Sequence, residues 1–243
     1  MLGGWLMAAA PAWAEDPAEC LVAIHQVERD FPLPRVVHAL ANKRLDILVI
    51  GAGSSTLPGH AKEAYPARLQ QALTEKLPGV SVTIATDVQS RRTAADMVKS
   101  LPSALAQAKP ALVVWQTGTV DAMLAIDPDD FSAALDQGVN LAHAGGADIV
   151  LVNSQYSPRT ESMIALGTYA DDLRWVALQQ EVPLFDRFAI MKLWSDLGTF
   201  DLSSATNQLD IAERVHNCLG ILLADLVIEA TRPEEPPAIA GGR

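Results

Sequence analysis

The chain has 243 residues, of which 49% are hydrophobic and 19% are charged, a composition typical of a globular protein with a substantial core and not of a disordered chain. Its formal net charge of −11 argues against a nucleic-acid partner and against attraction to anionic membrane surfaces. No segment reaches the roughly 18 uninterrupted apolar residues of a membrane span, so we expect none.

The N-terminal sequence MLGGWLMAAAPAWAEDPAEC has the pattern of an export signal. Residues 2–10 form a short apolar core, and Ala12, Trp13 and Ala14 fit the small-x-small cleavage rule, which predicts a signal peptide over residues 1–14. No Lys or Arg precedes the apolar core, so the true start of this signal stays open. We expect a periplasmic or secreted protein.

Only two cysteines occur, Cys20 and Cys218. In an oxidising compartment they are candidates for one disulfide between the N-terminal arm and the last helix, the alternative being two unrelated buried thiols. Two cysteines so far apart exclude both a C-x-x-C redox motif and a cysteine zinc site. Since no H-x-H or H-x-x-x-H pair occurs either, we predict no metal site and no cofactor.

Strand and helix patterns alternate along the chain. Five runs have the length and side-chain pattern of strands, at residues 47–51, 81–86, 111–116, 148–153 and 182–185. Apolar residues at helical spacing predict helices over residues 61–76, 94–108, 129–144, 161–180, 187–197 and 208–229. This alternation predicts an α/β fold with a five-stranded parallel sheet of order 2-1-3-4-5 and helices on both faces. We expect one domain over residues 15–230 and a disordered Pro/Gly-rich tail over residues 231–243.

The segment LDILVIGAGSSTLPG, residues 45–59, is the most informative stretch, because its glycines and serines follow a buried strand directly. Gly51 and Gly53 match the opening of a dinucleotide-binding fingerprint, with Asp87 as a candidate ribose-binding acid. However, Thr56 stands where the third glycine belongs, and Asp87 lies well beyond the usual offset of about 20 residues. We therefore disfavour a nucleotide site. The alternative is that this turn positions a nucleophilic serine.

Several segments resemble the SGNH (GDSL-type) hydrolase family, in an exported branch. They are VIGAGSSTLPG with AYPARLQQAL, then LVVWQTGTVDAM, LVNSQYSP and VPLFDRFAIMKLW, and the likeness runs from about residue 20 to residue 226. The resemblance implies a flavodoxin-like, three-layer α/β/α sandwich and an ester hydrolase for acylated carbohydrate or lipid. It also implies a serine nucleophile, an oxyanion hole of glycine and asparagine donors, and an Asp-x-x-His pair that activates the serine.

The serine block of the family is present and the glycine block is not. Alignment on Thr56 places Ser54 at the nucleophile position, with Ser55 as an alternative, although these hydroxyls could instead cap the next helix. Ser90 or Arg91 stands where the family has its oxyanion glycine. Arg91 could attract an anionic ligand, or Arg91 and Arg92 could be a solvated loop pair.

The asparagine and base blocks are also substituted. Val120 replaces the oxyanion asparagine, and Asp121 remains beside it as a structural residue. Asn207 stands at the position of the family's aspartate and Asp210 at that of its histidine, where an aspartate is a poor base for a serine hydroxyl. His60 is a candidate relocated base, whereas we expect the helix residue His216 to be packed or on the surface.

Two functions follow from this pattern. In the first, the chain is a pseudoenzyme that binds an acylated carbohydrate, a lipid or an unknown protein partner through the family's cleft. In the second, it is an active serine ester hydrolase with a rearranged site, in which Ser54 works with His60 or with Asp210 raised in pKa by burial.

Overall fold

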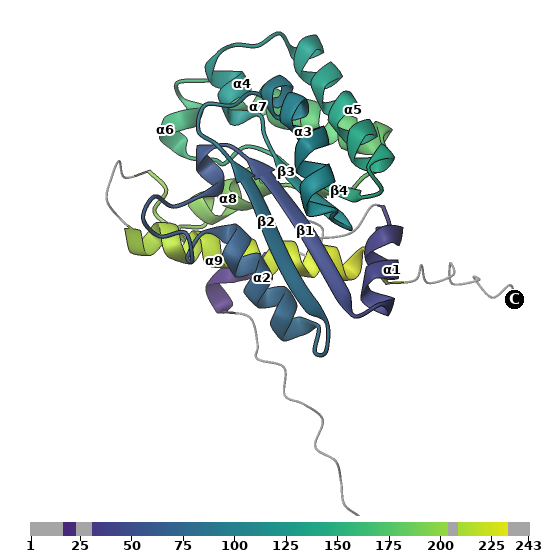
Figure 1. The fold of residues 1–243 in the computed structure, drawn as a ribbon. Helices are drawn as coiled ribbons and strands as arrows, with labels where there is room; N and C mark the ends of the chain where they lie inside the picture. The colour runs from purple at the N-terminus through teal and green to yellow at the C-terminus, as the bar shows by residue number, and fades with distance from the viewer. Residues whose placement is uncertain (1–16, 23–30, 204–208, 233–243) are drawn as a thin grey trace, which may run out of the picture.

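The computed structural model describes residues 17–22, 31–203 and 209–232. Five parallel strands form a central sheet with the order β2-β1-β3-β4-β5 (Figure 1). They are β1 (Arg44–Gly51), β2 (Ser81–Val88), β3 (Leu112–Gln116), β4 (Asp148–Val152) and β5 (Leu184–Phe185). Every residue of β3 and β4 is buried, as is typical of parallel strands covered on both faces. The predicted α/β fold class and strand order are confirmed.

Helices cover both faces of the sheet and complete a three-layer sandwich (Figure 1). One face is covered by α1 (Pro34–Ala41), α2 (Tyr65–Lys76) and α9 (Leu209–Glu229), and the other by α3 (Ala94–Ala108), α5 (Pro128–Ala144) and α7 (Leu166–Gln179). The other described helices are α4 (Thr119–Met123), α6 (Pro158–Glu161), α8 (Arg187–Asp196) and the 3₁₀ segments Ala18–Cys20 and Gly53–Ser55.

The structure differs from the predicted helices in three places. The helix predicted from residue 61 begins at Tyr65, because Pro66 lacks an N–H and is tolerated only in a first helical turn. The helix predicted over residues 161–180 is divided into α6 and α7, and the turn between them brings Ile164 and Leu166 against the core. The two helices α1 and α4 were not predicted.

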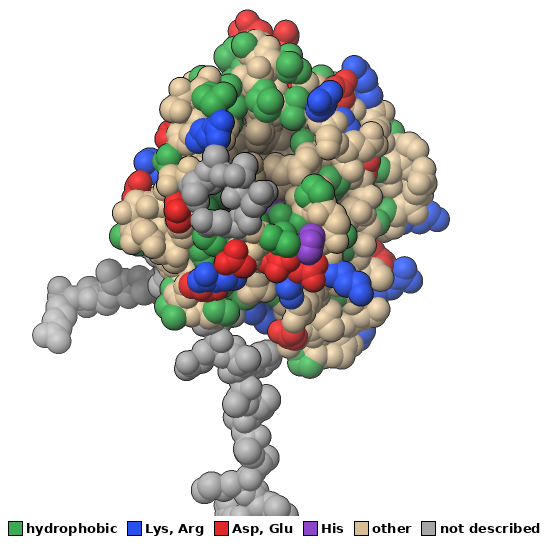
Figure 2. All heavy atoms as spheres, turned by 90° about the vertical axis from the view of Figure 1, so that its left-hand side faces the viewer, with side chains coloured by type: hydrophobic (Ala, Val, Ile, Leu, Met, Phe, Trp, Pro, Cys, Tyr) green, Lys and Arg blue, Asp and Glu red, His purple; other side chains and the backbone are tan. Residues whose placement is uncertain are grey.

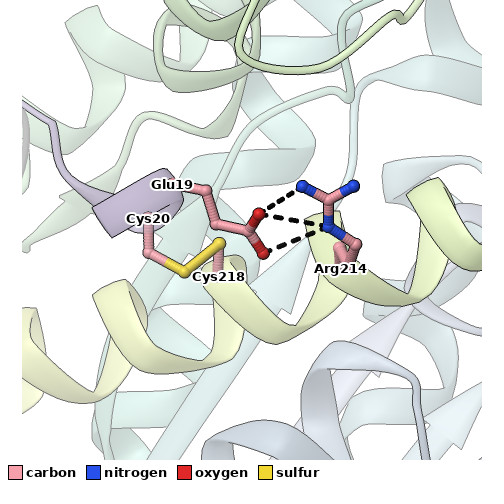
Figure 3. The surroundings of a disulfide bond; sticks show 4 residues. All are labelled: Glu19, Cys20, Arg214 and Cys218. Atoms are coloured by element: carbon pink, nitrogen blue, oxygen red, sulfur yellow. Dashed lines mark hydrogen bonds and ion pairs between the residues drawn. A yellow bond between two sulfur atoms is a disulfide. The ribbon is translucent and has the colours of Figure 1, made fainter. Parts of the chain in front are cut away.

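α9 is held against the rest of the molecule by close packing and by a covalent bond. A Cβ on Gly220 would lie 2.8 Å from the backbone of Arg68 and Leu69, so only glycine allows α9 to approach α2 this closely. Cys20 and Cys218 form a disulfide that links the N-terminal arm to α9 (Figure 3). The predicted disulfide is therefore confirmed, and the alternative of two unrelated thiols is wrong. Glu19 and Arg214 form an exposed ion pair beside it.

Two predictions lie outside the described residues, namely the signal peptide over residues 1–14 and the tail from residue 233 onward. The search of the described helices finds none that is both long and apolar enough to cross a bilayer.

We expect the disulfide to be a major source of stability, because it closes a loop of 198 residues. In the chain-entropy model a bond of this span contributes about 4–5 kcal/mol. In the double variant Cys20→Ala with Cys218→Ala, the free energy of unfolding should fall by most of this amount. Urea denaturation monitored by circular dichroism measures the change. Glu19→Gln, which removes only the neighbouring ion pair, should leave stability nearly unchanged. A double variant as stable as the parent would contradict this account.

Candidate functional site

The turn after β1 is a short 3₁₀ segment at the carboxyl edge of the sheet. The N–H of Ser55 donates to the carbonyl of Ala52 over 2.9 Å, and that of Thr56 donates to the carbonyl of Gly53 over 3.3 Å. A Cβ on Gly51 would lie 2.0 Å from Ser55 Oγ, so this glycine makes room for the serine hydroxyl. Gly51, which matched the dinucleotide-binding fingerprint, is thus required by packing within the turn itself.

The two serines of the turn have different environments. Ser55 is 1% exposed, and its hydroxyl donates to Gln116 Oε1 over 2.6 Å while the Tyr65 hydroxyl lies 3.5 Å away. Ser54 is partly exposed, and its Oγ accepts a hydrogen bond from Gln116 Nε2. Of the two candidate nucleophiles, only Ser54 is placed where a molecule from solvent could reach it.

The orientation of the Gln116 amide decides the chemistry available to Ser54. Arg187 has only donors, and its Nη1 lies 2.9 Å from one amide atom of Gln116, so that atom must be the oxygen. The amide nitrogen therefore points at Ser54 Oγ and donates to it. Gln116 cannot accept the proton of Ser54 in this arrangement, and it cannot serve as a general base.

Arg187 is the first residue of α8, and its guanidinium is buried directly beneath the turn. It is 1% exposed and donates to the carbonyl of Ser54 over 3.0 Å, to Gln116 and, over 3.3 Å, to Gln155 Oε1. None of these acceptors is a carboxylate, and among the described residues Arg187 forms no ion pair. Burial lowers the pKa of Arg187 to about 10, so the group is still charged at neutral pH. The Tyr65 ring, 5.8 Å from the guanidinium carbon, adds a cation–π contact.

The loop after β2 comes close to this turn. A Cβ on Gly53 would lie 3.4 Å from Ser90 Oγ, so the residue predicted at the oxyanion glycine position is a neighbour of the serine turn. Arg91 is exposed and has a φ of 64°, a backbone conformation that glycine adopts more readily. The interpretation of Arg91 and Arg92 as a solvated pair is wrong for Arg92, which is 8% exposed and ion-paired with Asp87 over 2.7 Å.

Val120 and Asp121, the residues predicted at the family's asparagine block, both contact other parts of the fold, and the valine side chain has no hydrogen-bond donor. Val120 is partly buried and packs against the core. Asp121 is 1% exposed, and its Oδ1 accepts from the backbone N–H of Ala94 over 2.9 Å, which ties α4 to the start of α3. Burial raises the pKa of Asp121, partly offset by these hydrogen bonds. Asp121 thus has the structural role that the resemblance implied.

At the base block, Asp210 is exposed in the first turn of α9, and Asn207 lies outside the described residues. Neither of the two histidines near the turn is hydrogen-bonded to Ser54 or Ser55 in the described part of the chain. His216 is 5% exposed, and its Nδ1 accepts from the backbone N–H of Tyr65 over 2.9 Å. His60 is partly exposed, and its Nδ1 lies 3.1 Å from Glu213 Oε1.

Comparisons with known proteins identify the family and similar folds. The sequence profile of the non-GDSL lipase-like family matches residues 19–233. The chain belongs to this family. A search of curated proteins finds no significant sequence match.

Solved structures of similar fold include esterases and lipases. TesA is 24% identical, with a TM-score of 0.58 over 74% of this chain and 98% of that one. A catalytic mutant of Axe2, an acetylxylan esterase from Geobacillus stearothermophilus, is 16% identical, with a TM-score of 0.61 over 78% and 97%. The lipase/acylhydrolase from Enterococcus faecalis is 18% identical, with a TM-score of 0.60 over 79% and 100%. The predicted SGNH-type family and fold are confirmed.

Sequence reasoning missed Gln116, Arg187 and Tyr65, which surround the serine turn. All three stand inside the segments that carry the family resemblance, WQTG, FDRF and AYPARL. Two features of the sequence could have indicated these residues. Gln116 is a polar residue at the end of an apolar strand, and Arg187 lies between two apolar runs that contain phenylalanine.

We expect Arg187→Met to lower the free energy of unfolding by about 2–4 kcal/mol. The substitution leaves the Ser54 carbonyl without a buried donor, which costs about 1–3 kcal/mol. It also removes one of the two hydrogen bonds to Gln116 Oε1, at about 1 kcal/mol, while the bond from Ser55 remains. Urea denaturation measures the change. The control Arg91→Met removes an exposed guanidinium from the neighbouring loop and should have little effect. Equal stabilities of the two variants would show that Arg187 does not support the turn.

A second prediction concerns His216, whose pKa is lowered from 6.5 to about 3, first by burial and then by the charge of Arg187. Between these values the unfolded chain binds a proton that the folded chain does not, so stability must fall as the pH falls. The slope from this group is at most about 1.4 kcal/mol per pH unit.

His216→Gln keeps an acceptor for the Tyr65 N–H and removes the titration. The free energy of unfolding of this variant should therefore fall less steeply between about pH 6 and pH 4 than that of the parent. Carboxylates titrate in both proteins, so the difference between the two curves reports His216 alone. Parallel curves would refute the assignment.

Proposed function

We propose that this protein is an exported SGNH-type relative that binds an acylated carbohydrate or lipid at the surface around Ser54 and hydrolyses esters poorly or not at all. The observation that carries the proposal is the hydrogen bond to Ser54 Oγ. It comes from the Gln116 amide nitrogen, a donor, where a working serine hydrolase needs a base that accepts the serine proton.

The other substitutions support the same conclusion. Asp210, at the position of the family's histidine, is exposed to solvent, and an exposed carboxylate is a poor base for a serine hydroxyl. Val120 offers no donor to an oxyanion, and the loss of one such donor costs roughly 2.7–4 kcal/mol of barrier. Because the parts of a triad act together, the serine alone supplies little catalysis.

The disulfide supports an exported protein, because such bonds persist in oxidising compartments. The signal-peptide pattern of residues 1–14 points the same way. The ligand class is inferred from the family and from proteins of similar fold, one of which is an acetylxylan esterase and another a lipase/acylhydrolase. A carbohydrate ester or a lipid would suit a surface inherited from such enzymes.

One observation favours a second candidate, an active hydrolase with a relocated base. His60 follows the serine turn by six residues, and its imidazole contacts the Glu213 carboxylate over 3.1 Å. A histidine oriented by a carboxylate is the arrangement of a general base. For this function, movement of the loop would have to bring the free imidazole nitrogen to Ser54 Oγ.

A set of ester assays separates the two candidates. With short aryl esters we expect the wild-type rate to be near background and unchanged in Ser54→Ala. The triple variant Val120→Asn, Asn207→Asp, Asp210→His should gain activity that each single substitution lacks, because the groups act only together. Turnover by the wild type that disappears in both Ser54→Ala and His60→Ala would overturn the first proposal and establish the second.

Binding is tested separately, by calorimetric titration of acetylated xylo-oligosaccharides and of short-chain phospholipid monomers. One of these two ligand classes should bind the wild type, and Ser54→Trp, which fills the surface beside the turn, should weaken that binding at least tenfold. Ser203→Trp is an exposed control. Absence of binding by both classes would refute the ligand-binding proposal.

A further inference from the structure

Three side chains that could bind a metal ion meet beside the serine turn, although the sequence spacing predicted no metal site. The ligand atoms of His60, Glu63 and Glu213 all lie within 4.8 Å of one another. His60 and Glu63 belong to the loop between the serine turn and α2, and Glu213 lies on α9. Figure 2 views the side of the molecule at which α9 begins, and acidic side chains gather there beside a histidine.

The backbone holds the three residues in place. The N–H of Glu63 donates to the carbonyl of His60 over 3.1 Å, which closes a turn that carries both side chains. The N–H of Tyr65 then donates to His216 Nδ1, and His216 follows Glu213 by three residues on α9. Since residues three apart lie on the same helix face, the bond that fixes the loop to α9 also directs Glu213 toward the loop.

Within the described residues, no basic side chain of lysine or arginine neutralises the two carboxylates of this cluster. Among the described residues, no Lys or Arg forms an ion pair with Glu63 or Glu213, and the only partner of Glu213 is His60. Two carboxylates at this separation repel each other in half-buried positions. A divalent cation would remove that repulsion and gain three ligands at once.

We propose that His60 Nδ1 and one carboxylate oxygen each from Glu63 and Glu213 bind a Zn²⁺ ion. Two ligand atoms at ordinary zinc bond lengths in a tetrahedral site are about 3.3–3.6 Å apart, close to the 3.1 Å already found between His60 and Glu213. All three ligand atoms lie within 4.8 Å of one another, so side-chain rotation of Glu63 would be enough to bring its carboxylate into the same coordination sphere.

The ligand set favours zinc over the hard cations. An imidazole nitrogen suits Zn²⁺ and related transition metals, whereas Ca²⁺ and Mg²⁺ take oxygen ligands. His60 and Glu213 keep 41% and 32% of their side-chain surface exposed, so water can complete the coordination. The cysteines do not compete, because they are bonded to each other.

The site does not depend on the proposed function. A bound ion would link the loop after the serine turn to the start of α9. It would also occupy His60 Nδ1 and so replace the proton-dependent contact with Glu213. If no metal ion binds here, the outcomes expected in the ester assays stay the same.

The experiment is a calorimetric titration of tag-free, oxidised, chelator-treated protein with ZnCl₂, repeated with CoCl₂ and read by visible absorption. We expect one equivalent of Zn²⁺ to bind, and Co²⁺ to give the intense visible bands of a four- or five-coordinate site. His60→Ala and Glu213→Gln should each weaken binding at least tenfold. Glu63→Gln should also weaken it.

His38→Ala is the matched control, since His38 is an exposed histidine on α1. Its affinity for Zn²⁺ should equal that of the parent, and circular dichroism should confirm that every variant is folded. The proposal is overturned if the parent binds no stoichiometric Zn²⁺, or if folded His60→Ala and Glu213→Gln bind it as well as His38→Ala does.

Discussion

A buried positive charge without a carboxylate partner is the constraint around which the serine turn is built. Taking a guanidinium out of water is costly unless its donors are satisfied. The Nη1 and Nη2 donors of Arg187 reach only neutral acceptors, and its buried Nε has no hydrogen-bond partner in the described part of the chain. The Ser54 carbonyl and Gln116 Oε1 are therefore held in fixed positions. Because Gln116 Oε1 accepts from Arg187, the amide nitrogen of Gln116 must face Ser54. The buried charge of Arg187 therefore decides that the Ser54 hydroxyl accepts a hydrogen bond from Gln116.

The same charge reaches beyond the turn. It helps to lower the pKa of His216, so that this histidine is neutral and accepts the N–H of Tyr65. That hydrogen bond fixes the loop before α2 against α9, at the place where the disulfide and Gly220 also hold α9. The serine turn, the loop between it and α2, and α9 are thus connected by hydrogen bonds and packing. The same connections bring His60 of the loop into contact with Glu213 of α9.

The fold was predictable from sequence because its determinants are local. Strand-length apolar runs such as β3 and the helical spacing of apolar residues in α3 are readable within a few residues, and strand order follows from crossover handedness. The Cys20–Cys218 bond was predictable from the count of cysteines and the export pattern. The Gln116 orientation was not, because it depends on an arginine 71 positions away.

The meeting of His60, Glu63 and Glu213 escaped prediction for the same reason. Metal-site reasoning from sequence relies on short spacings, and Glu213 lies 150 positions from Glu63 and 153 from His60. The division of α6 from α7 also depends on tertiary packing, because Ile164 and Leu166 turn inward between them. The contacts that escaped prediction join distant segments that no motif marks, whereas the equally distant Cys20–Cys218 pair was marked by the cysteine count.

The proposed loss of the family's catalytic groups is compatible with a stable fold. The residues predicted at those positions lie where substitution costs little stability: Val120 packs against the core, while Arg91 and Asp210 are exposed. The residues that support the turn, Ser55 and Arg187, are buried and hydrogen-bonded, so their loss would leave polar groups unsatisfied. Exposed residues of the site can therefore be substituted while the buried residues that support the serine turn are kept.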